Sequence, residues 1–433
     1  MASQSEPSEP LLLSSFLKSG KLKEAEKESR VKLHGVDLDS YSGYITVDKE
    51  QDKNLFFWFF PATKVEPTEA PLLLYLNGGP GNSSFIGLFV EVGPLRVDKD
   101  LKLHRAEVAW TDNFNIIFVD NPVFVGFSYA KPGHESKNLH AITDNLYSFV
   151  TQFLQIYPKF KDCDFYVGGV SYAGKYVASL ASKIHSEMEE EESDIGINMR
   201  GIFVFSGFFD PFQMFHNYPQ YLLTMGLISE KKARNLSEKL AYALDKHRLL
   251  GKYEEAVMDL MDSVFTQMHK TLGFDSLDNI LITKKYEWHF EKYLNKPEVQ
   301  HAIHARACQY TFQEENMLVH MAEDFIKGVP TELKIALESY KVLMVSGQMD
   351  MVVSVPMVES FLHDFRWSGM SRYLSADKIM WKDKDGEVAG YVTEVKNLTR
   401  VVMRKAGHRP ALDQPEWTLE MMTKFLSDQS FAH

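Results

Sequence analysis

Short, continuous apolar runs alternate with helix-type patterns along most of this chain, and this alternation constrains the fold more than any other feature. Each run is closed by glycine, proline or polar residues, which fits strands that are buried on both faces. Strands that alternate with helices predict a mostly parallel sheet flanked by helices, so the expected fold class is α/β. The runs are Leu55–Phe60, Leu72–Leu76, Asn115–Val119, Phe165–Gly168, Gly201–Phe205, Lys341–Ser346 and Arg400–Arg404.

The alternation stops between about residues 209 and 340, where the patterns are helical. We expect an inserted helical cap over the carboxyl edge of the sheet, because strand-type runs resume afterwards; a separate helical domain is the alternative. The predicted division is an N-terminal surface arm (1–33), an α/β core (34–208 and 341–433) and the cap (209–340). The expected cap helices are Glu230–Leu250, Tyr253–Met268, Tyr286–Leu294 and Met317–Phe325.

Charge and cysteine content exclude several classes of protein. The net charge of −12 argues against nucleic acid as a partner and disfavours an anionic membrane surface, because phosphate binding needs a basic surface. No run of about 18 apolar residues is present, so no membrane span is expected. Two cysteines, Cys163 and Cys308, exclude a disulfide framework but leave one disulfide possible.

The candidate nucleophile is Ser171. The run Phe165–Gly168 leads directly into the turn Gly169-Val170-Ser171-Tyr172-Ala173-Gly174, and a helix-type pattern follows. A serine at such an apex projects its Oγ above the sheet edge, beside the N–H groups of the helix N-terminus. Small residues suit the crowded turn, although the second position after the serine holds Ala173 instead of the commoner glycine. Serines near glycine are usual in turns, so the flanking strand and helix carry the assignment.

A serine nucleophile needs a base, and the base needs an acid that orients it. Asp350 follows one strand-type run and His408 follows the next, which reproduces the Ser, Asp, His order of α/β-hydrolases. Each residue alone would be read as an ordinary turn residue. Because both come just after a strand, at the edge where the serine emerges, the three together predict a catalytic triad. This chemistry requires no metal and no cofactor, and none is predicted.

The tetrahedral intermediate of acyl transfer needs two convergent N–H donors. The Tyr172 N–H, directly after the nucleophile, is one candidate. The second is expected from the glycine-rich loop Asn77–Ser84, since glycine allows a close backbone approach. This loop lacks the Gly-Lys-Ser/Thr ending of a phosphate-binding loop and the spacing of a dinucleotide fingerprint, so both are rejected.

Six motifs occur in an order that resembles the serine carboxypeptidases, over about residues 9–425. Three further segments, LFFWFFPA, CDFYVGG and GEVAGYV, look closest to the animal vitellogenic-like carboxypeptidase branch. The resemblance implies an α/β-hydrolase fold with a helical cap, the removal of single residues from peptide C-termini, and work in lysosomal or secretory compartments. The six motifs are NGGPGNSS, FVEVGP, DNPVFVGFSY, GVSYAGKYV, GQMD and AGHRPALDQP.

The resemblance also implies roles for single residues. It places the nucleophile, acid and base on Ser171, Asp350 and His408, and the oxyanion donors on Gly79 and Tyr172.

The substrate-binding positions depart from the family pattern. The peptide carboxylate site uses Asn77 and a pair of glutamates that share a proton; one is Glu91, but the other position holds Val170. Glu91 alone would tend to ionise and repel a peptide C-terminus. Arg409 replaces a residue that is usually apolar, and it could neutralise Glu91, bind a substrate carboxylate or point into solvent. Asn82 also stands where relatives usually have Cys or Gly.

Location follows from weaker signals. The stretch Met1–Leu13 lacks the basic region and apolar stretch of a secretory signal, and several cysteines typical of relatives are missing. The sequence as it stands therefore predicts a cytoplasmic protein. Sequons at Asn82, Asn235 and Asn397 would instead suit a secreted protein whose signal has been removed, although such tripeptides arise often by chance.

Three functions fit these patterns. The first is a serine hydrolase of peptides that still acts as a carboxypeptidase through an acyl-enzyme. The second is an acyltransferase or esterase that uses the same acyl-enzyme, and product analysis with an acceptor alcohol would separate it from the first. The third is a non-catalytic binding protein, which would not react with a fluorophosphonate probe. The oligomeric state is left open.

Overall fold

The computed structural model describes residues 9–189, 196–246 and 249–431. Within these residues ten strands form one sheet in the order β1-β2-β6-β3-β7-β8-β9-β12-β11-β10. The six central strands, β6 to β12 in this order, run parallel, and the pairs at both edges are antiparallel. The strands are β1 Tyr41–Asp48, β2 Lys53–Phe60, β3 Leu72–Leu76, β6 Asn115–Val119, β7 Phe165–Val170, β8 Met199–Phe205, β9 Lys341–Gly347, β10 Ile379–Lys382, β11 Val388–Val395 and β12 Leu398–Met403. The predicted α/β class is confirmed.

The apolar runs are continuous because two separate cores cover the two faces of the sheet. Along β2, Phe57 and Phe59 belong to one core, whereas Phe56, Trp58 and Phe60 belong to the other. Successive side chains of a strand point to opposite faces, so a strand between two cores is apolar at every position. All seven predicted strands are present, and β3 and β6 have the predicted bounds.

The sequence analysis missed β1, β10 and β11. These strands lie in the antiparallel edge regions, and β10 and β11 carry exposed residues among buried ones. Their mixed polarity gave no continuous apolar run, because antiparallel strands need to be apolar on only one face.

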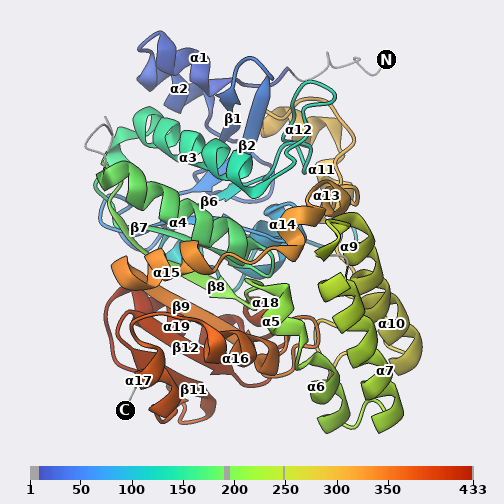
Figure 1. Cartoon of the computed structure of the whole chain (residues 1–433). Helices are drawn as coiled ribbons and strands as arrows, with labels where there is room; N and C mark the ends of the chain where they lie inside the picture. Colours follow the sequence, from blue (N-terminus) through green and yellow to red (C-terminus); the bar gives the residue numbers. More distant parts are fainter. Residues whose placement is uncertain (1–8, 190–195, 247–248, 432–433) are drawn as a thin grey trace.

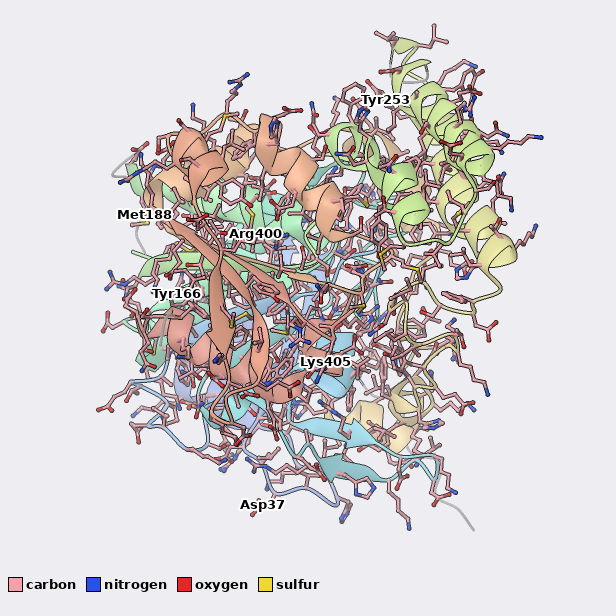
Figure 2. The ribbon with its side chains drawn as sticks, turned by 90° about the horizontal axis from the view of Figure 1, so that it is seen from below. Asp37, Tyr166, Met188, Tyr253, Arg400 and Lys405 are labelled. Atoms are coloured by element: carbon pink, nitrogen blue, oxygen red, sulfur yellow. The ribbon has the colours of Figure 1, made fainter. Side chains whose placement is uncertain are left out.

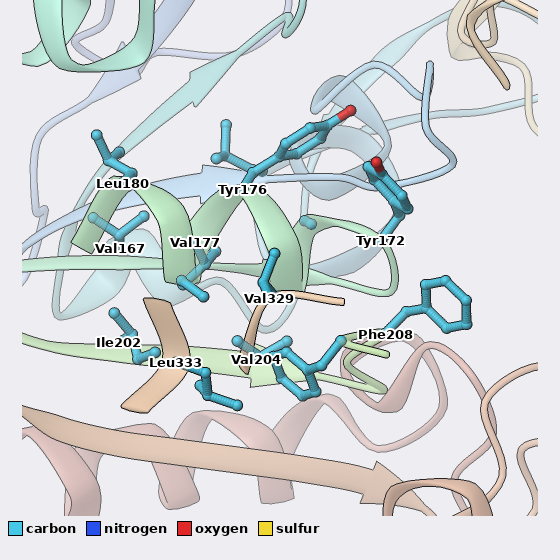
Figure 3. Packing of buried hydrophobic residues seen from close by; sticks show 14 of the residues in the cluster. Val167, Tyr172, Tyr176, Val177, Leu180, Ile202, Val204, Phe208, Val329 and Leu333 are labelled. Carbon is cyan, nitrogen blue, oxygen red and sulfur yellow. The ribbon is translucent and has the colours of Figure 1, made fainter. Parts of the chain in front are cut away.

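Helices cover both faces of the sheet (Figure 1). On one face α3 (Leu139–Ile156) and α4 (Ala173–Glu189) lie side by side, and α15 (Pro330–Ser339) packs against α4. Figure 3 shows this packing: Val177 and Leu180 of α4 lie close to Val167 of β7 and Ile202 of β8. The remaining core helices are α16 Val355–Asp364, α17 Met370–Ser375, α18 Pro410–Asp413 and α19 Pro415–Leu426.

Short elements complete the core. They are the hairpin of β4 (Leu95–Val97) and β5 (Leu103–Arg105), the π-helical turn Gly87–Glu91, and the 3₁₀ turns Trp110–Asp112 and Pro158–Phe160. Figure 2 shows the sheet from below, with Arg400 and Lys405 at the C-terminal strands and Tyr253 on the cap helices.

The N-terminal arm is more than a polar surface segment. Its described part forms α1 (Leu13–Lys18) and α2 (Leu22–Glu28). Leu13 and Ala25 are fully buried in the core, and the Ser14 hydroxyl donates to Gln152 of α3 at 2.6 Å. Residues 1–8 lie outside the described part.

Between β8 and β9 the described chain is helical, and α7, α9 and α10 stand beside the sheet (Figure 1). Two predicted helices differ from the structure. The one expected from Tyr286 begins only at Phe290, because Tyr286 is held by a hydrogen bond to Asp413, and the one over Met317–Phe325 is split into α13 and α14. Residues 247–248 of the predicted Glu230–Leu250 helix are not described. The helices are α5 Pro211–Phe215, α6 Tyr218–Thr224, α7 Glu230–Ala241, α9 Tyr253–Met261, α10 Gln267–Leu272, α11 Phe290–Leu294, α12 Pro297–Ala302, α13 Met317–His320 and α14 Ala322–Ile326, with π-helical turns at Tyr242–Lys246 and Asp262–Thr266.

Both cysteines are free thiols: Cys163 is buried and Cys308 is partly buried. The disulfide that the sequence left open is therefore not formed in this structure. In the described part of the chain, none of the helices combines the length and apolar character needed to cross a membrane.

Candidate active site

Ser171 lies at the apex of a sharp turn between β7 and α4. Its φ of +63° is in the left-handed region, which residues other than glycine seldom adopt and which here turns the chain from strand to helix. Its N–H donates to the Phe205 carbonyl of β8 at 2.9 Å, which anchors the turn to the neighbouring strand. Gly169 is required at this crowded turn, because a Cβ there would lie 2.2 Å from the Leu76 carbonyl oxygen.

Asp350 and His408 come together just after β9 and β12, as the shared sheet edge predicted. The His408 Nδ1 lies 3.0 Å from Asp350 Oδ2, and both side chains are buried. The other carboxylate oxygen accepts the N–H groups of Val352 and Val353 at 2.7 and 2.9 Å. Since an ionised carboxylate can only accept, Nδ1 carries the proton and Nε2 is left as the base.

The surroundings of His408 raise its pKa above the ordinary imidazole value. Burial lowers the pKa, but the Asp350 carboxylate outweighs this through its charge and hydrogen bond, and Asp278 adds to it. The Arg409 guanidinium opposes the two carboxylates. An imidazole with a raised pKa is a stronger base towards the Ser171 hydroxyl once it is neutral.

The glycine-rich loop lies directly against the turn that carries the nucleophile. A Cβ on Gly78 would be only 2.6 Å from the Tyr172 backbone nitrogen, so the close approach requires glycine here. Gly79 follows with a φ of +108°. Within the described residues, neither the Gly79 nor the Tyr172 N–H has a hydrogen-bond acceptor, which leaves both free for an oxyanion.

Ser171 and His408 line one cavity of about 800 Å³, and Asp350 is buried behind His408. Cap residues such as Met261, Phe265 and His269 line it together with core residues. The volume is sufficient for a peptide end of several residues, since typical ligand pockets hold about 300–1,000 Å³.

One part of the cavity wall is aromatic. Phe325 of α14 stacks on Tyr172, with ring centroids 5.6 Å apart and planes 8° apart, and it also packs against Phe208. Figure 3 shows Tyr172 and Phe208 at the end of this apolar cluster. Phe325 is held in place by Lys175, whose fully buried ammonium donates to the carbonyl oxygens of Asp324, Phe325 and Lys327.

The predicted carboxylate-binding residues lie at another part of the wall, where Asn77 and Arg409 line the cavity and Glu91 is buried behind them. Glu91 ends the π-helical turn Gly87–Glu91 and is buried. Its carboxylate accepts the Tyr75 hydroxyl at 2.8 Å and the Asn77 amide at 3.1 Å. The Asn77 Oδ1 in turn accepts the Gly87 N–H at 2.9 Å, so the Asn77 side chain is held at both ends.

Arg409 points inward, not into solvent. Its Nη1 lies 2.5 Å from Glu91 Oε1, and its guanidinium carbon lies 5.2 Å from the centroid of the Trp288 ring. The Nε lies 3.4 Å from Asp278 Oδ2. The carboxylates of Glu91 and Asp278 together raise the pKa of Arg409 despite its burial, so the guanidinium stays charged.

Val170 also lines the cavity and is buried among apolar neighbours, so this position supplies no proton to Glu91. Four site residues escaped the sequence analysis: Tyr75, Lys175, Asp278 and Trp288. Tyr75 lies inside the apolar run LLLYL, Lys175 lies inside the motif GVSYAGKYV with no role assigned to it, and Asp278 and Trp288 lie in segments that carry no motif. Asn82 lies within the glycine-rich loop Asn77–Ser84, where it forms an isolated β-bridge with Gln313 and lines the cavity.

Comparison with known proteins agrees with this geometry. The family profile described as "Serine carboxypeptidase" matches residues 31–428. The chain belongs to the serine carboxypeptidase family. It is 34% identical to the "Probable serine carboxypeptidase CPVL" of Homo sapiens, over 98% of this chain and 91% of that protein. It is 32% identical to the "Vitellogenic carboxypeptidase" of Aedes aegypti, over 97% of this chain and 90% of that protein.

Among solved structures, the chain is similar to Kex1, a prohormone-processing carboxypeptidase from Saccharomyces cerevisiae. The TM-score is 0.81 at 21% sequence identity, and the match covers 93% of this chain and 96% of that chain. At this identity the match concerns the fold, and it agrees with an α/β-hydrolase fold whose mostly parallel sheet is flanked by helices.

Proposed function

We propose that this member of the serine carboxypeptidase family hydrolyses peptides through an acyl-enzyme on Ser171. The observation that carries the proposal is the placement of Ser171, the buried Asp350–His408 pair and two unused backbone N–H groups around one cavity. These groups supply a nucleophile, a base held in one tautomer, and an oxyanion site.

The reaction follows from these roles. The Ser171 Oγ attacks the scissile carbonyl while His408 Nε2 takes its proton, and the Gly79 and Tyr172 N–H groups receive the negative oxygen. His408 then returns the proton to the leaving amine as the C–N bond breaks. Water enters, gives a proton to His408 and attacks the ester carbonyl, and collapse of the second intermediate regenerates the Ser171 hydroxyl. Asp350 stabilises the imidazolium in both steps.

Labelling with a fluorophosphonate probe tests this assignment. Wild-type protein should become labelled at Ser171, as peptide mass mapping would show, and Ser171→Ala should lose both the label and about 10⁶-fold of the turnover of a blocked dipeptide. Ser179→Ala is the matched control, because Ser179 lies buried on α4, the helix that follows Ser171, and its hydroxyl has no hydrogen-bond partner among the described residues. Equal labelling of wild type and Ser171→Ala would overturn the proposal.

The proposed ligands are peptides, with nucleic acid and membrane surfaces left out as partners on grounds of charge and hydropathy. The cytoplasmic location stays a prediction. Fractionation of the native cells, followed by glycosidase treatment, would test it: a glycosylated product in a secretory or lysosomal fraction would show it to be wrong.

A further inference from the structure

The Glu91 carboxylate is already occupied by donors. It accepts from the Tyr75 hydroxyl, the Asn77 amide and the Arg409 guanidinium. Burial, with the nearby Glu91 charge second, raises the pKa of Tyr75 well above its usual value, so this hydroxyl remains a donor at neutral pH. Both oxygens of this carboxylate therefore already accept hydrogen bonds from side chains of the protein.

Arg409, by contrast, has guanidinium N–H groups that make no hydrogen bond within the described residues. Only Nη1 makes a hydrogen bond within the described residues, since Nε is buried without a hydrogen-bond partner and no acceptor faces Nη2. Arg409 lines the cavity next to His408, the residue that hands its proton to the leaving amine, and Trp288 covers one face of the guanidinium. A planar guanidinium with an open edge is well suited to a carboxylate.

The charges around Arg409 balance. Glu91 and Asp278 are the carboxylates nearest to it, and the partly buried Arg96 donates to the Glu91 backbone carbonyl at 3.1 Å. Burial lowers the pKa of Arg96 to about 10, which still leaves it cationic at neutral pH. Further out, Lys285 lines the same cavity.

Asp413 of α18 is a further acid near this wall, and it is turned away towards the Asn279 amide, the Tyr286 hydroxyl and the Gly407 N–H. Next to Arg409 itself, the two carboxylates of Glu91 and Asp278 are therefore matched by the two cations Arg409 and Arg96, while Asp275, Glu314 and Glu315 line the same cavity as Lys285. His408 does not change this count when it is neutral.

We propose that Arg409 binds a carboxylate of the leaving residue, so that this enzyme recognises the end of a peptide by a permanent charge instead of a shared proton. The inference rests on the proposed function and names its substrate class: peptides that carry a free carboxylate on the residue released. The carboxylate can come from the peptide C-terminus or from an acidic side chain of the same residue, and the experiment separates the two.

Recognition by Arg409 and recognition by a shared proton differ in their dependence on pH. A shared proton is lost as the pH rises, so recognition through it fades towards neutral pH, whereas Arg409 stays charged. The preference for a free acid over its amide should therefore persist unchanged between about pH 6 and pH 8.

Three blocked dipeptides with phenylalanine before the scissile bond make the test: one ends in leucine acid, one in leucine amide and one in glutamate α-amide. A phenylalanine methyl ester, which has no leaving residue, reports acylation by itself. The variants are Arg409→Leu and the double variant Arg409→Leu/Glu91→Gln, which avoids leaving Glu91 buried and unpaired. Lys285→Met is the matched control, because it removes a different cation from the same cavity.

We expect wild type to prefer the leucine acid over the leucine amide at pH 7.5. The double variant should lose about 10- to 100-fold in kcat/KM for the acid, mainly through KM, as expected for the loss of a charged hydrogen bond. Compared at a pH above the rising limb of each enzyme, where His408 is neutral, the amide and the ester should stay within about twofold, and Lys285→Met should keep the preference. If the loss falls on the glutamate α-amide instead, Arg409 binds a carboxylate of the side chain.

Two results would overturn the inference: equal use of acids and amides by wild type at pH 7.5, or an unchanged acid preference in the double variant. The ester separates this failure from failure of the proposed function, because an enzyme that hydrolyses the ester through Ser171 without any carboxylate preference retains the triad chemistry and lacks only the role of Arg409.

Discussion

Two buried cations lie beside the active-site cavity, and they differ in how their donors are used. Lys175 of α4 gives its N–H groups to three backbone carbonyls, from Asp324, Phe325 and Lys327. An ammonium group has three N–H bonds, so Lys175 has none left for a ligand. Arg409 donates to Glu91 through Nη1 and has its Nε buried beside Asp278, while its Nη2 makes no hydrogen bond within the described residues and the side chain lines the cavity.

The difference shows how a buried charge can serve structure in one place and recognition in another. Lys175 holds the last turn of α14 and thereby the ring of Phe325 against Tyr172. Burial lowers the pKa of Lys175 to about 7, opposed by Asp210, Asp324 and Glu332, so its charge is costly to keep. That cost is offset by the carbonyl groups that it satisfies. Lys175, whose N–H groups are all used, therefore stabilises the cavity wall, whereas Arg409, which has an unused N–H group, can bind a substrate.

The largest expected effect tests the structural half of this comparison. Lys175→Met leaves three carbonyl oxygens without their donor, and we expect the free energy of unfolding to fall by about 2–4 kcal/mol in urea titrations. Lys183→Met is the matched control on the same helix, because its ion pairs with Asp144 and Glu187 are partly exposed, and it should cost less than about 1 kcal/mol. Equal stability of the two variants would show that Lys175 does not hold α14.

A smaller effect should separate the two parts of the cavity wall. If the carboxylate of the leaving residue lies at Arg409, the acyl part of the substrate must lie towards Phe325 and Tyr172. Phe325→Ala should then lower kcat/KM about tenfold for substrates with phenylalanine before the scissile bond, relative to alanine, without altering the acid-to-amide ratio.

Phe312→Ala serves as the control for this selectivity, because Phe312 lines the same cavity but packs on Trp288, with ring centroids 5.5 Å apart. The measurement is kcat/KM for the substrates with phenylalanine and with alanine before the scissile bond, and only Phe325→Ala should lower the ratio between them. A Phe325→Ala enzyme that loses its acid preference instead would mean that the two parts of the wall are not separate.

The smallest effect concerns the pH dependence of acylation. His408 must be neutral to accept the Ser171 proton, so kcat/KM for an ester rises with pH through the His408 pKa, which lies above the ordinary imidazole value. Asp278 raises this pKa and Arg409 lowers it. Asp278→Asn should therefore move the rising limb to lower pH and Arg409→Leu should move it to higher pH. Profiles that shift in the same direction for both variants would contradict this arrangement.

Most of the core could be predicted from the chain because its signals are local. The turn at Ser171 is specified by a strand, small residues and a helix within one short segment, and the strands before Asp350 and His408 place both at the same edge. The antiparallel strands β1, β10 and β11 had no such signal, since polar residues and glycine interrupt their apolar residues.

The substrate pocket was predictable only in part. The resemblance to a family indicated Asn77, Glu91 and Val170 and left Arg409 with three possible roles. Tyr75, Asp278 and Trp288 could not be found, because an aromatic or acidic residue becomes part of a pocket only through the residues that fold brings beside it.

The sequence by itself determined the α/β sheet and the order of the candidate triad. The patterns that predict a buried strand or a strand–turn–helix lie within short segments of neighbouring residues. Only the tertiary structure decided that Arg409 turns inward to Glu91, a partner 318 residues away along the chain. It also decided that the Lys175 ammonium donates to three carbonyl oxygens at the end of α14, whereas the Arg409 guanidinium makes only one hydrogen bond within the described residues. Such pairings depend on how the cap and the strand ends meet in space, and a charge has no fixed role until the burial and the partners around it are set.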